Sequence, residues 1–218
     1  MSDFDLDTVD RLLSTTRAVR KRLDLDRPVE PEVITDCIRL SQQAPTGSNM
    51  QNWRWIVVSD EERRAKLADI YRAAGGDYLA AAAETATDGQ IARVMDSANY
   101  LAQNLEKVPV HVIPCVKGLM TSENSVGEWS GMMGSIYPAI WSFQLALRSR
   151  GLGSCLTTLH LFKAKEAAEV LGMPDDIMQI ALLPVAYTAG TDFKPADRPP
   201  VERIVHWNDW GQKTPPAS

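Results

Sequence analysis

The chain has 218 residues, 44% of them hydrophobic and 23% charged, a composition typical of a folded globular protein. Its formal net charge of −5 argues against a nucleic-acid partner, because binding a phosphate backbone needs a basic surface. No run approaches the ~20 apolar residues of a membrane helix, and residues 1–10 do not resemble a signal peptide, so we expect a cytoplasmic protein with no membrane partner.

The first half of the chain alternates helical and strand patterns. Helices are expected at 8–16, from Pro31 to just before Pro45, at 60–74 and at 89–107, and strands at 53–58 and 108–116. The polar stretch 117–130 follows and is typical of a surface loop or lid. Met120, Val126 and Trp129 make it the candidate for substrate selection.

The second half begins with a helix at 132–149 that is apolar on nearly every face. Such a helix is buried all round, which in a small domain indicates contact with another subunit. Strands at 154–159 and 177–187 flank a helix at 163–171. We therefore predict an α+β fold, with a central mixed sheet surrounded by helices.

A change in composition after Gly190 divides the chain into a core, residues 1–190, and a C-terminal arm, residues 191–218. The arm is proline-rich and then carries large apolar residues, including Ile204, Trp207 and Trp210, which need a surface to pack on. Cysteines and histidines show neither paired cysteine motifs nor metal-ligand spacing, so we expect no disulfide framework, no metal site and an organic cofactor.

Basic residues at 17–22 are the first candidate for chemistry. Arg17, Arg20, Lys21 and Arg22 form either a solvated helix end or an anion site, since guanidinium groups bind phosphate through paired, charge-assisted hydrogen bonds. Arg198, between prolines in the arm, indicates little when considered alone.

Polar side chains in the loop 45–52 are the second candidate. Ser48, Asn49 and Gln51 offer hydroxyl and carboxamide groups that could recognise a flat heterocycle, although a plain surface turn has the same composition. Gly151 and Gly153 are the third candidate, because glycine permits a close backbone approach to a ligand, but a short glycine pair more often ends a helix. Neither a dinucleotide fingerprint nor a P-loop is present.

Four stretches in register resemble the nitroreductase family of flavoproteins over roughly residues 8–210. Residues 17–20 (Arg-Ala-Val-Arg) resemble its N-terminal phosphate motif, and residues 44–53 resemble its Ala-Pro-Ser-x-x-Asn-x-Gln-Pro-Trp loop. The helix before Gly151-Leu152-Gly153 resembles its central helix and turn, and residues 198–202 resemble its C-terminal Arg-x-Pro-[LV]-Glu element.

The sequence departs from the family pattern at several positions. Ala18 replaces a common serine, Asn52 replaces a proline, and one alignment makes Lys21 the second phosphate cation in place of Arg20. Thr157 and Thr158 resemble hydroxyl residues that some members place near the flavin, whereas others have an acidic residue there.

The resemblance implies an intertwined homodimer with FMN at its interface and NAD(P)H as the electron donor. It places Arg17, Arg20 or Lys21, and Arg198 at the phosphate, Ser48, Asn49 and Gln51 at the ribityl chain or ring, and Gly153, Thr157 and Thr158 along another edge of the flavin. The substrates would be nitroaromatics, quinones or similar small electron-poor molecules. The cofactor carries the redox chemistry, so no catalytic side chain is expected.

Other functions are compatible with the same sequence. The same fold could serve reductive dehalogenation, ene reduction or flavin breakdown, or a protein that binds flavin without catalysis. A hydrolase with a Ser-His-Asp or Cys-His site is a formal alternative, but the nucleophile motif GxSxG is missing.

Overall fold

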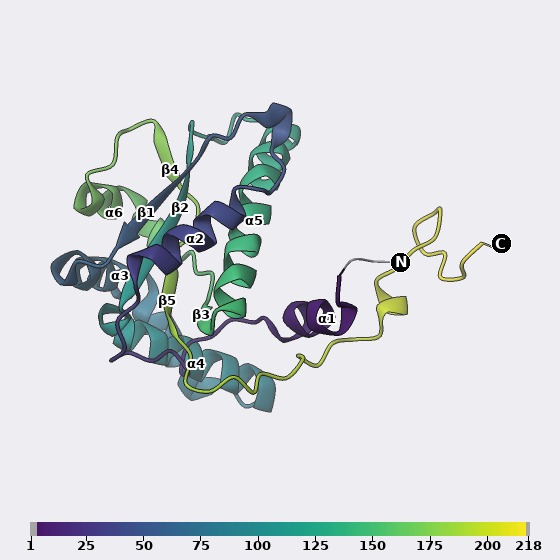
Figure 1. Ribbon diagram of the computed structural model, residues 1–218, viewed down its shortest axis with the longest axis horizontal. Helices are drawn as coiled ribbons and strands as arrows, with labels where there is room; N and C mark the ends of the chain where they lie inside the picture. The colour runs from purple at the N-terminus through teal and green to yellow at the C-terminus, as the bar shows by residue number, and fades with distance from the viewer. Residues whose placement is uncertain (1–3, 217–218) are drawn as a thin grey trace.

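Five strands form an antiparallel sheet at the centre of the computed structural model, which describes residues 4–216 (Figure 1). The strands are β1 (Trp53–Val58), β2 (Val110–Lys117), β3 (Leu152–Ser154), β4 (Ile177–Gln179) and β5 (Leu183–Tyr187). Their spatial order is β1, β2, β5, β3, and β4 also pairs with β2. The expected mixed sheet was wrong in this detail, because every strand pair within residues 4–216 is antiparallel. Buried apolar strands show no direction in their sequence.

Helices cover both faces of the sheet, as the α+β prediction requires (Figure 1). Their bounds are α1 (Leu6–Thr15), α2 (Pro31–Ser41), α3 (Glu61–Thr85), α4 (Gly89–Asn104), α5 (Val126–Ser149) and α6 (Ala164–Leu171). Side chains of β2 alternate between the two layers: Ile113 and Cys115 pack with α3 and α4, whereas Val112 and Val116 pack with α2 and α5. This central strand therefore joins two apolar cores.

Helix α3 runs about ten residues beyond its expected end near Ala74. The chain kinks at Gly75, and the alanine-rich stretch after it remains helical. A Cβ atom on Gly75 would lie 2.7 Å from a methyl group of Leu159. The glycine thus permits close packing here instead of ending the helix.

Two expected strands differ from the structure. The strand predicted at 154–159 was wrong, because β3 ends at Ser154 and Thr157 makes only an isolated bridge to Leu182. The strand predicted at 177–187 is divided into β4 and β5. Three residues, 180–182, lie opposite two residues of β2, so the division is a bulge next to Pro114, which has no backbone N–H to donate.

Helix α5 begins at Val126, six residues before its expected start. The hydroxyl of Ser125 accepts a hydrogen bond from the Glu128 amide, and the Glu128 carboxylate accepts one from the Ser125 amide. This reciprocal capping fixes the start of the helix. The expected loop 117–130 is thereby shortened to about 118–125.

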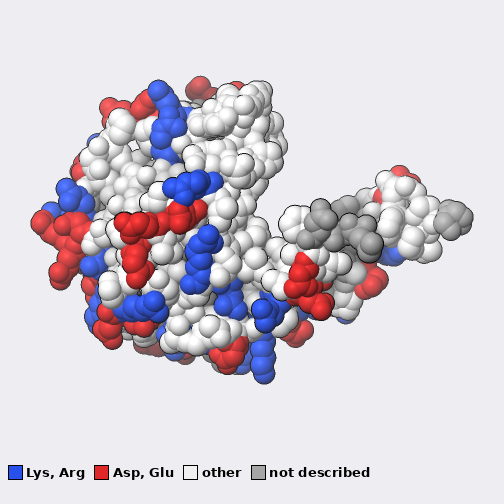
Figure 2. Space-filling view, viewed as in Figure 1, with Lys and Arg blue, Asp and Glu red and all other residues white. Residues whose placement is uncertain are grey.

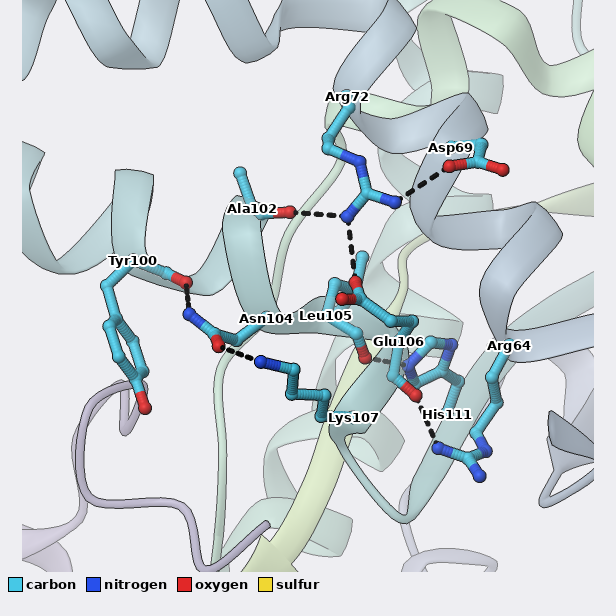
Figure 3. A network of polar contacts seen from close by, with 10 residues as sticks. All are labelled: Arg64, Asp69, Arg72, Tyr100, Ala102, Asn104, Leu105, Glu106, Lys107 and His111. Atoms are coloured by element: carbon cyan, nitrogen blue, oxygen red, sulfur yellow. Dashed lines mark hydrogen bonds and ion pairs between the residues drawn. The ribbon is translucent and has the colours of Figure 1, made fainter.

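Residues 191–194 after Gly190 still contact the core, and the arm then runs past α1 (Figures 1 and 2). It has little regular structure apart from one turn at Val201–Arg203. Trp210 is 92% exposed and Ile204 is 74% exposed, so these two apolar side chains of the arm are not covered within one chain. None of the helices within residues 4–216 is long and apolar enough to cross a membrane.

Candidate functional site

The basic segment 17–22 lies against β3 and turns at residues 20–22. The amide of Val19 donates a hydrogen bond to the Ser154 carbonyl over 2.9 Å, and Leu23 forms a bridge with Thr188. A Cβ atom on Gly153 would lie 2.7 Å from Thr188 Cγ2 and 3.0 Å from Val19 Cβ. Gly153 is therefore required for the close approach of the basic segment to the sheet.

Two of the four cations in this segment are neutralised by carboxylates. Lys21 forms a salt bridge with Asp96 of α4, and Arg22 forms one with Asp192 at 2.6 Å. The hydrogen bond that Arg22 donates to the Asp192 carboxylate, together with the charge of Arg22, lowers the pKa of Asp192. Lys21 and Arg22 are thus engaged in holding α4 and the start of the arm.

The other two cations lack a carboxylate partner among residues 4–216. Arg17 donates a hydrogen bond to the Lys194 carbonyl at 3.1 Å, and Arg20 donates one to the Ser97 hydroxyl at 3.3 Å. Both contacts are to neutral acceptors, so each guanidinium keeps its positive charge available to a ligand. Arg20 and Lys21 therefore differ in their partners: Lys21 pairs with a carboxylate, and Arg20 contacts a neutral hydroxyl.

A groove of about 380 Å³ lies between the basic segment, α4 and the arm, and we call it the arginine groove. Four arginines line it, and none has a salt bridge within the described part of the chain: Arg17, Arg20, Arg93 and Arg198. This excess of positive charge suits one phosphate group.

Residues of α4 in this groove were not identified from the sequence. Gln90, Arg93 and Ser97 line it, and their spacing of three and four residues places them on one helical face. A polar stripe with this spacing was visible in the sequence. The pairing of that stripe with residues 17–20, about 75 residues earlier, required the fold.

The two threonines after β3 have different environments. The hydroxyl of Thr157 lies 2.9 Å from that of Tyr71, a buried residue of α3, whereas the side chain of Thr158 has no such contact and is exposed. Burial raises the pKa of Tyr71, and nearby Arg20 acts in the opposite direction. Burial also raises the pKa of Cys155 to about 11, again against the influence of Arg20. Arg20 thus connects the basic segment to this edge of the sheet.

The polar loop 45–52 holds three left-handed residues that are not glycine. Ser48, Asn49 and Gln51 have φ angles of 51°, 54° and 47°, and their side chains are exposed. The Gln51 carboxamide donates to the Asn49 side-chain oxygen over 2.8 Å, and the Gly47 amide donates to Ser135 of α5 over 3.0 Å. Strained backbone of this kind costs about 1–3 kcal/mol per residue and is concentrated at ligand-binding loops.

The polar loop lies beside the first half of α5, and the basic segment that follows α1 lies near the end of this helix (Figure 1). Gly47 contacts Ser135 in the first half of this helix, whereas Arg148 at its end contacts Thr15, two residues before Arg17. Thirteen helical residues separate Ser135 from Arg148, which corresponds to about 20 Å. One chain therefore brings together Arg17, Arg20, Gly153, Thr157 and Arg198, but it does not bring Ser48, Asn49 and Gln51 to them.

The model of the nitroreductase family matches residues 13–187. The chain belongs to the nitroreductase family. The match spans the basic segment, the polar loop, all five strands and the region after β3. The arm and Arg198 lie outside it. Among residues 4–216 no group of three or more His, Cys, Asp or Glu side chains could hold a metal ion.

Curated relatives of this nitroreductase-family chain carry several activities in their names. An iodotyrosine deiodinase of Thermotoga neapolitana is 24% identical and covers 90% of this chain and 96% of its own length. An FMN reductase (NADPH) of Bacillus subtilis is 22% identical, over 87% of this chain and 70% of its own.

Solved structures share the fold. An iodotyrosine deiodinase bound to FMN and 3-iodo-L-tyrosine matches with a TM-score of 0.71 at 21% identity, over 93% of this chain and all of the other. An FMN and NADPH-dependent nitroreductase from a Sphigopyxis strain matches with a TM-score of 0.67 at 21% identity, over 92% and 99% of the two chains. These likenesses confirm the predicted nitroreductase-like α+β fold.

Proposed function

We propose that the chain is an FMN-dependent oxidoreductase that uses NAD(P)H to reduce nitroaromatics, quinones or similar electron-poor molecules by two-electron, ping-pong transfer. The observation that carries the proposal is the arginine groove, where Arg17, Arg20, Arg93 and Arg198 form no salt bridge within residues 4–216. Family membership and relatives that bind FMN or are named for it support the same cofactor.

The residues present fit one terminal phosphate. Arg17, Arg20 and Arg198 would neutralise it, with the Ser97 hydroxyl as a further hydrogen-bonding group. Bound FMN would accept hydride from NAD(P)H and pass it to the second substrate. The chain itself would bind and orient the cofactor, with Thr157 and Thr158 along one edge of the ring.

We propose that the working form is a homodimer, because one chain cannot complete the site. Ser48, Asn49 and Gln51 follow Gly47, which contacts Ser135, whereas Arg17 follows Thr15, which contacts Arg148 about 20 Å further along α5. We therefore expect the loop to reach a cofactor in the arginine groove from a second copy. Tyr137 and Trp141 of α5 are 40% and 43% exposed. Figure 2 shows a largely uncharged surface at the upper right, over the beginning of α5, and a wide indentation between the core and the arm.

The arm is proposed to embrace the partner, with residues 1–190 as the core domain and 191–218 as the packing arm. Its exposed Ile204, Trp207 and Trp210 would then be buried on the second copy. The proposal also explains why Arg198, on an otherwise unpacked segment, lines the groove.

Identification of the cofactor tests this function directly. The purified full-length protein is denatured and the released molecule is identified by chromatography, with FMN expected. FAD, or no flavin after reconstitution, would contradict the proposal. Steady-state oxidation of NADH and NADPH with nitroaromatic and quinone acceptors should give parallel lines in double-reciprocal plots, whereas a ternary complex would exclude ping-pong transfer.

Reductive dehalogenation is the second candidate, since relatives named iodotyrosine deiodinase align over 81–90% of this chain. Its test compares turnover of iodinated phenols and of nitroaromatics by the same flavin-loaded preparation. Release of iodide at a rate above that of nitro reduction would favour this alternative.

A further inference from the structure

A second pocket of about 350 Å³ lies where α1, the end of α5 and the start of the arm meet. Its lining includes Arg11 and Thr15 of α1, Arg148 of α5, and Thr191 and Phe193 of the arm. It shares no lining residue with the arginine groove, and a hollow lined by Arg17, Arg22 and Phe193 lies between the two.

Positive charge in this pocket is not balanced by carboxylates. Neither Arg11 nor Arg148 forms a salt bridge within residues 4–216, and nearby Arg22 has one, with Asp192. Burial lowers the pKa of Arg148, and the charges of Arg11 and Arg22 act in the same direction. The charge of Arg22 is balanced by Asp192, whereas Arg11 and Arg148 repel each other, and an anion bound between these two would relieve that repulsion.

The guanidinium of Arg148 is held in place by neutral groups. It lies over the Phe193 ring at 4.6 Å, and its Nη2 donates hydrogen bonds to the Thr191 carbonyl at 3.2 Å and to the Thr15 hydroxyl at 3.5 Å. Its Nε is buried and has no hydrogen-bond partner. A fixed guanidinium with a buried, unused donor is the arrangement expected of an oxyanion site, because planar arginine donors pair with phosphate oxygens.

We infer that this pocket binds a phosphate group through Arg11 and Arg148, independently of the cofactor in the arginine groove. The proposal does not depend on the redox reaction, since it needs only the positions and charges of these residues. Two sources share this chemistry, free phosphate and the phosphate of a nucleotide.

Phosphate at this position would also act on the arm. Thr191 and Phe193 contact Arg148, Asp192 pairs with Arg22, and the Lys194 carbonyl accepts the hydrogen bond of Arg17. Four consecutive residues of the arm therefore run from the second pocket to the arginine groove. Fixing Arg148 with an anion would hold this stretch against the core.

Calorimetric titration of the full-length, flavin-saturated protein with orthophosphate tests the site. Arg148→Met removes the charge and keeps a long side chain, and Arg150→Met is the matched control, because Arg150 lies two residues further along and does not line the pocket. We expect Arg148→Met to weaken phosphate binding at least about ten-fold, the scale of a lost charge-assisted contact, and Arg150→Met to leave it within about two-fold. Arg11→Gln provides a second, exposed position and is expected to weaken binding several-fold.

Three results would overturn the inference: no phosphate binding by the wild type, equal binding by Arg148→Met and wild type, or binding that is lost in Arg17→Ala but kept in Arg148→Met. The last would place phosphate in the arginine groove. Flavin absorbance of the same samples reports the cofactor separately, so failure of this site and failure of the proposed function are distinguishable.

Adenosine 2′-phosphate separates the two sources of the phosphate. Binding at least about ten-fold tighter than orthophosphate, and sensitive to Arg148→Met, would support a nucleotide as ligand. Equal affinity for both would support free phosphate.

Discussion

Lys21 forms a salt bridge with Asp96, whereas its neighbour Arg20 donates a hydrogen bond to the neutral hydroxyl of Ser97. Adjacent cations of the same segment thus have different tasks. Lys21 attaches the segment to α4, whereas no salt bridge within residues 4–216 neutralises Arg20. This difference leads to the first prediction.

Replacing Arg20 by alanine should weaken FMN binding by about 1.5–3 kcal/mol, the scale of a hydrogen bond to a charged group, and Arg17→Ala should do the same. Lys21→Ala should change FMN affinity much less, because its charge is already paired and half exposed. Flavin fluorescence quenching gives the three dissociation constants. A larger effect at Lys21 than at Arg20 would reverse the assignment.

Gly153→Ala should displace the basic segment, because the new Cβ would lie 2.7 Å from Thr188 and 3.0 Å from Val19. We expect a loss of about 1–3 kcal/mol in the free energy of unfolding, together with weaker FMN binding. Gly134→Ala on α5 is the control, since no heavy atom lies within 4 Å of its new methyl group. Replacing this helical glycine should stabilise the protein by up to about 1 kcal/mol. Urea unfolding of both variants measures the difference.

Stability should fall as the pH decreases from about 6.5 to about 4. Burial lowers the pKa of His111 and of His160 to about 4 in the folded chain, and an unfolded histidine titrates near 6.5. The unfolded state therefore takes up protons first, so stability present above pH 6.5 is lost as the pH falls, by about 2–3 kcal/mol for each histidine.

Denaturant unfolding at several pH values measures this loss. His160→Leu should roughly halve the pH dependence, since it removes one of the two groups. The carboxylates with lowered pKa values, such as Asp88 and Glu128, change protonation below about pH 4.5. The loss of stability between about pH 4.5 and 6.5 is therefore attributed to the histidines. A flat profile between pH 4.5 and 6.5 would contradict the prediction.

Deleting residues 194–218 should abolish both dimer and cofactor binding, because the deletion removes Arg198 from the arginine groove together with the exposed apolar side chains of the arm. Sedimentation and flavin absorbance of full-length and truncated protein provide the measurement. A full-length monomer that retains flavin, or a truncated protein that remains dimeric and yellow, would refute the proposed role of the arm.

The sequence predicted the elements that have strong local signals. Strand β1 was predicted at its observed bounds, and Pro31 marked the start of α2, because an apolar run and an N-terminal proline act locally. The bulge between β4 and β5 was missed, since it depends on Pro114 in another strand. The antiparallel direction of the sheet was missed for a similar reason, because it is set by connections across the fold.

The candidate-site residues that the sequence indicated were likewise those with a recognisable local motif. The family motifs indicated Arg17, Arg20 and Arg198, and the structure places all three along one groove. Arg93 and Ser97 were missed because their helix had no motif, and only packing brings it beside residues 17–20. The pairing of Lys21 with Asp96 spans 75 residues, so the sequence left Arg20 and Lys21 as alternatives.

The position of the loop beside the first half of α5, and of the basic segment near its end, predicts how two different mutant subunits behave when they form a mixed dimer. In a dimer, each site would take its groove from one subunit and its loop from the other. Pairing an Arg17→Ala subunit with an Asn49→Ala subunit would then concentrate both defects in one site and leave the second site wholly wild type. Two inactive mutants mixed and reassembled should recover up to about half the activity per mixed dimer, which is intersubunit complementation.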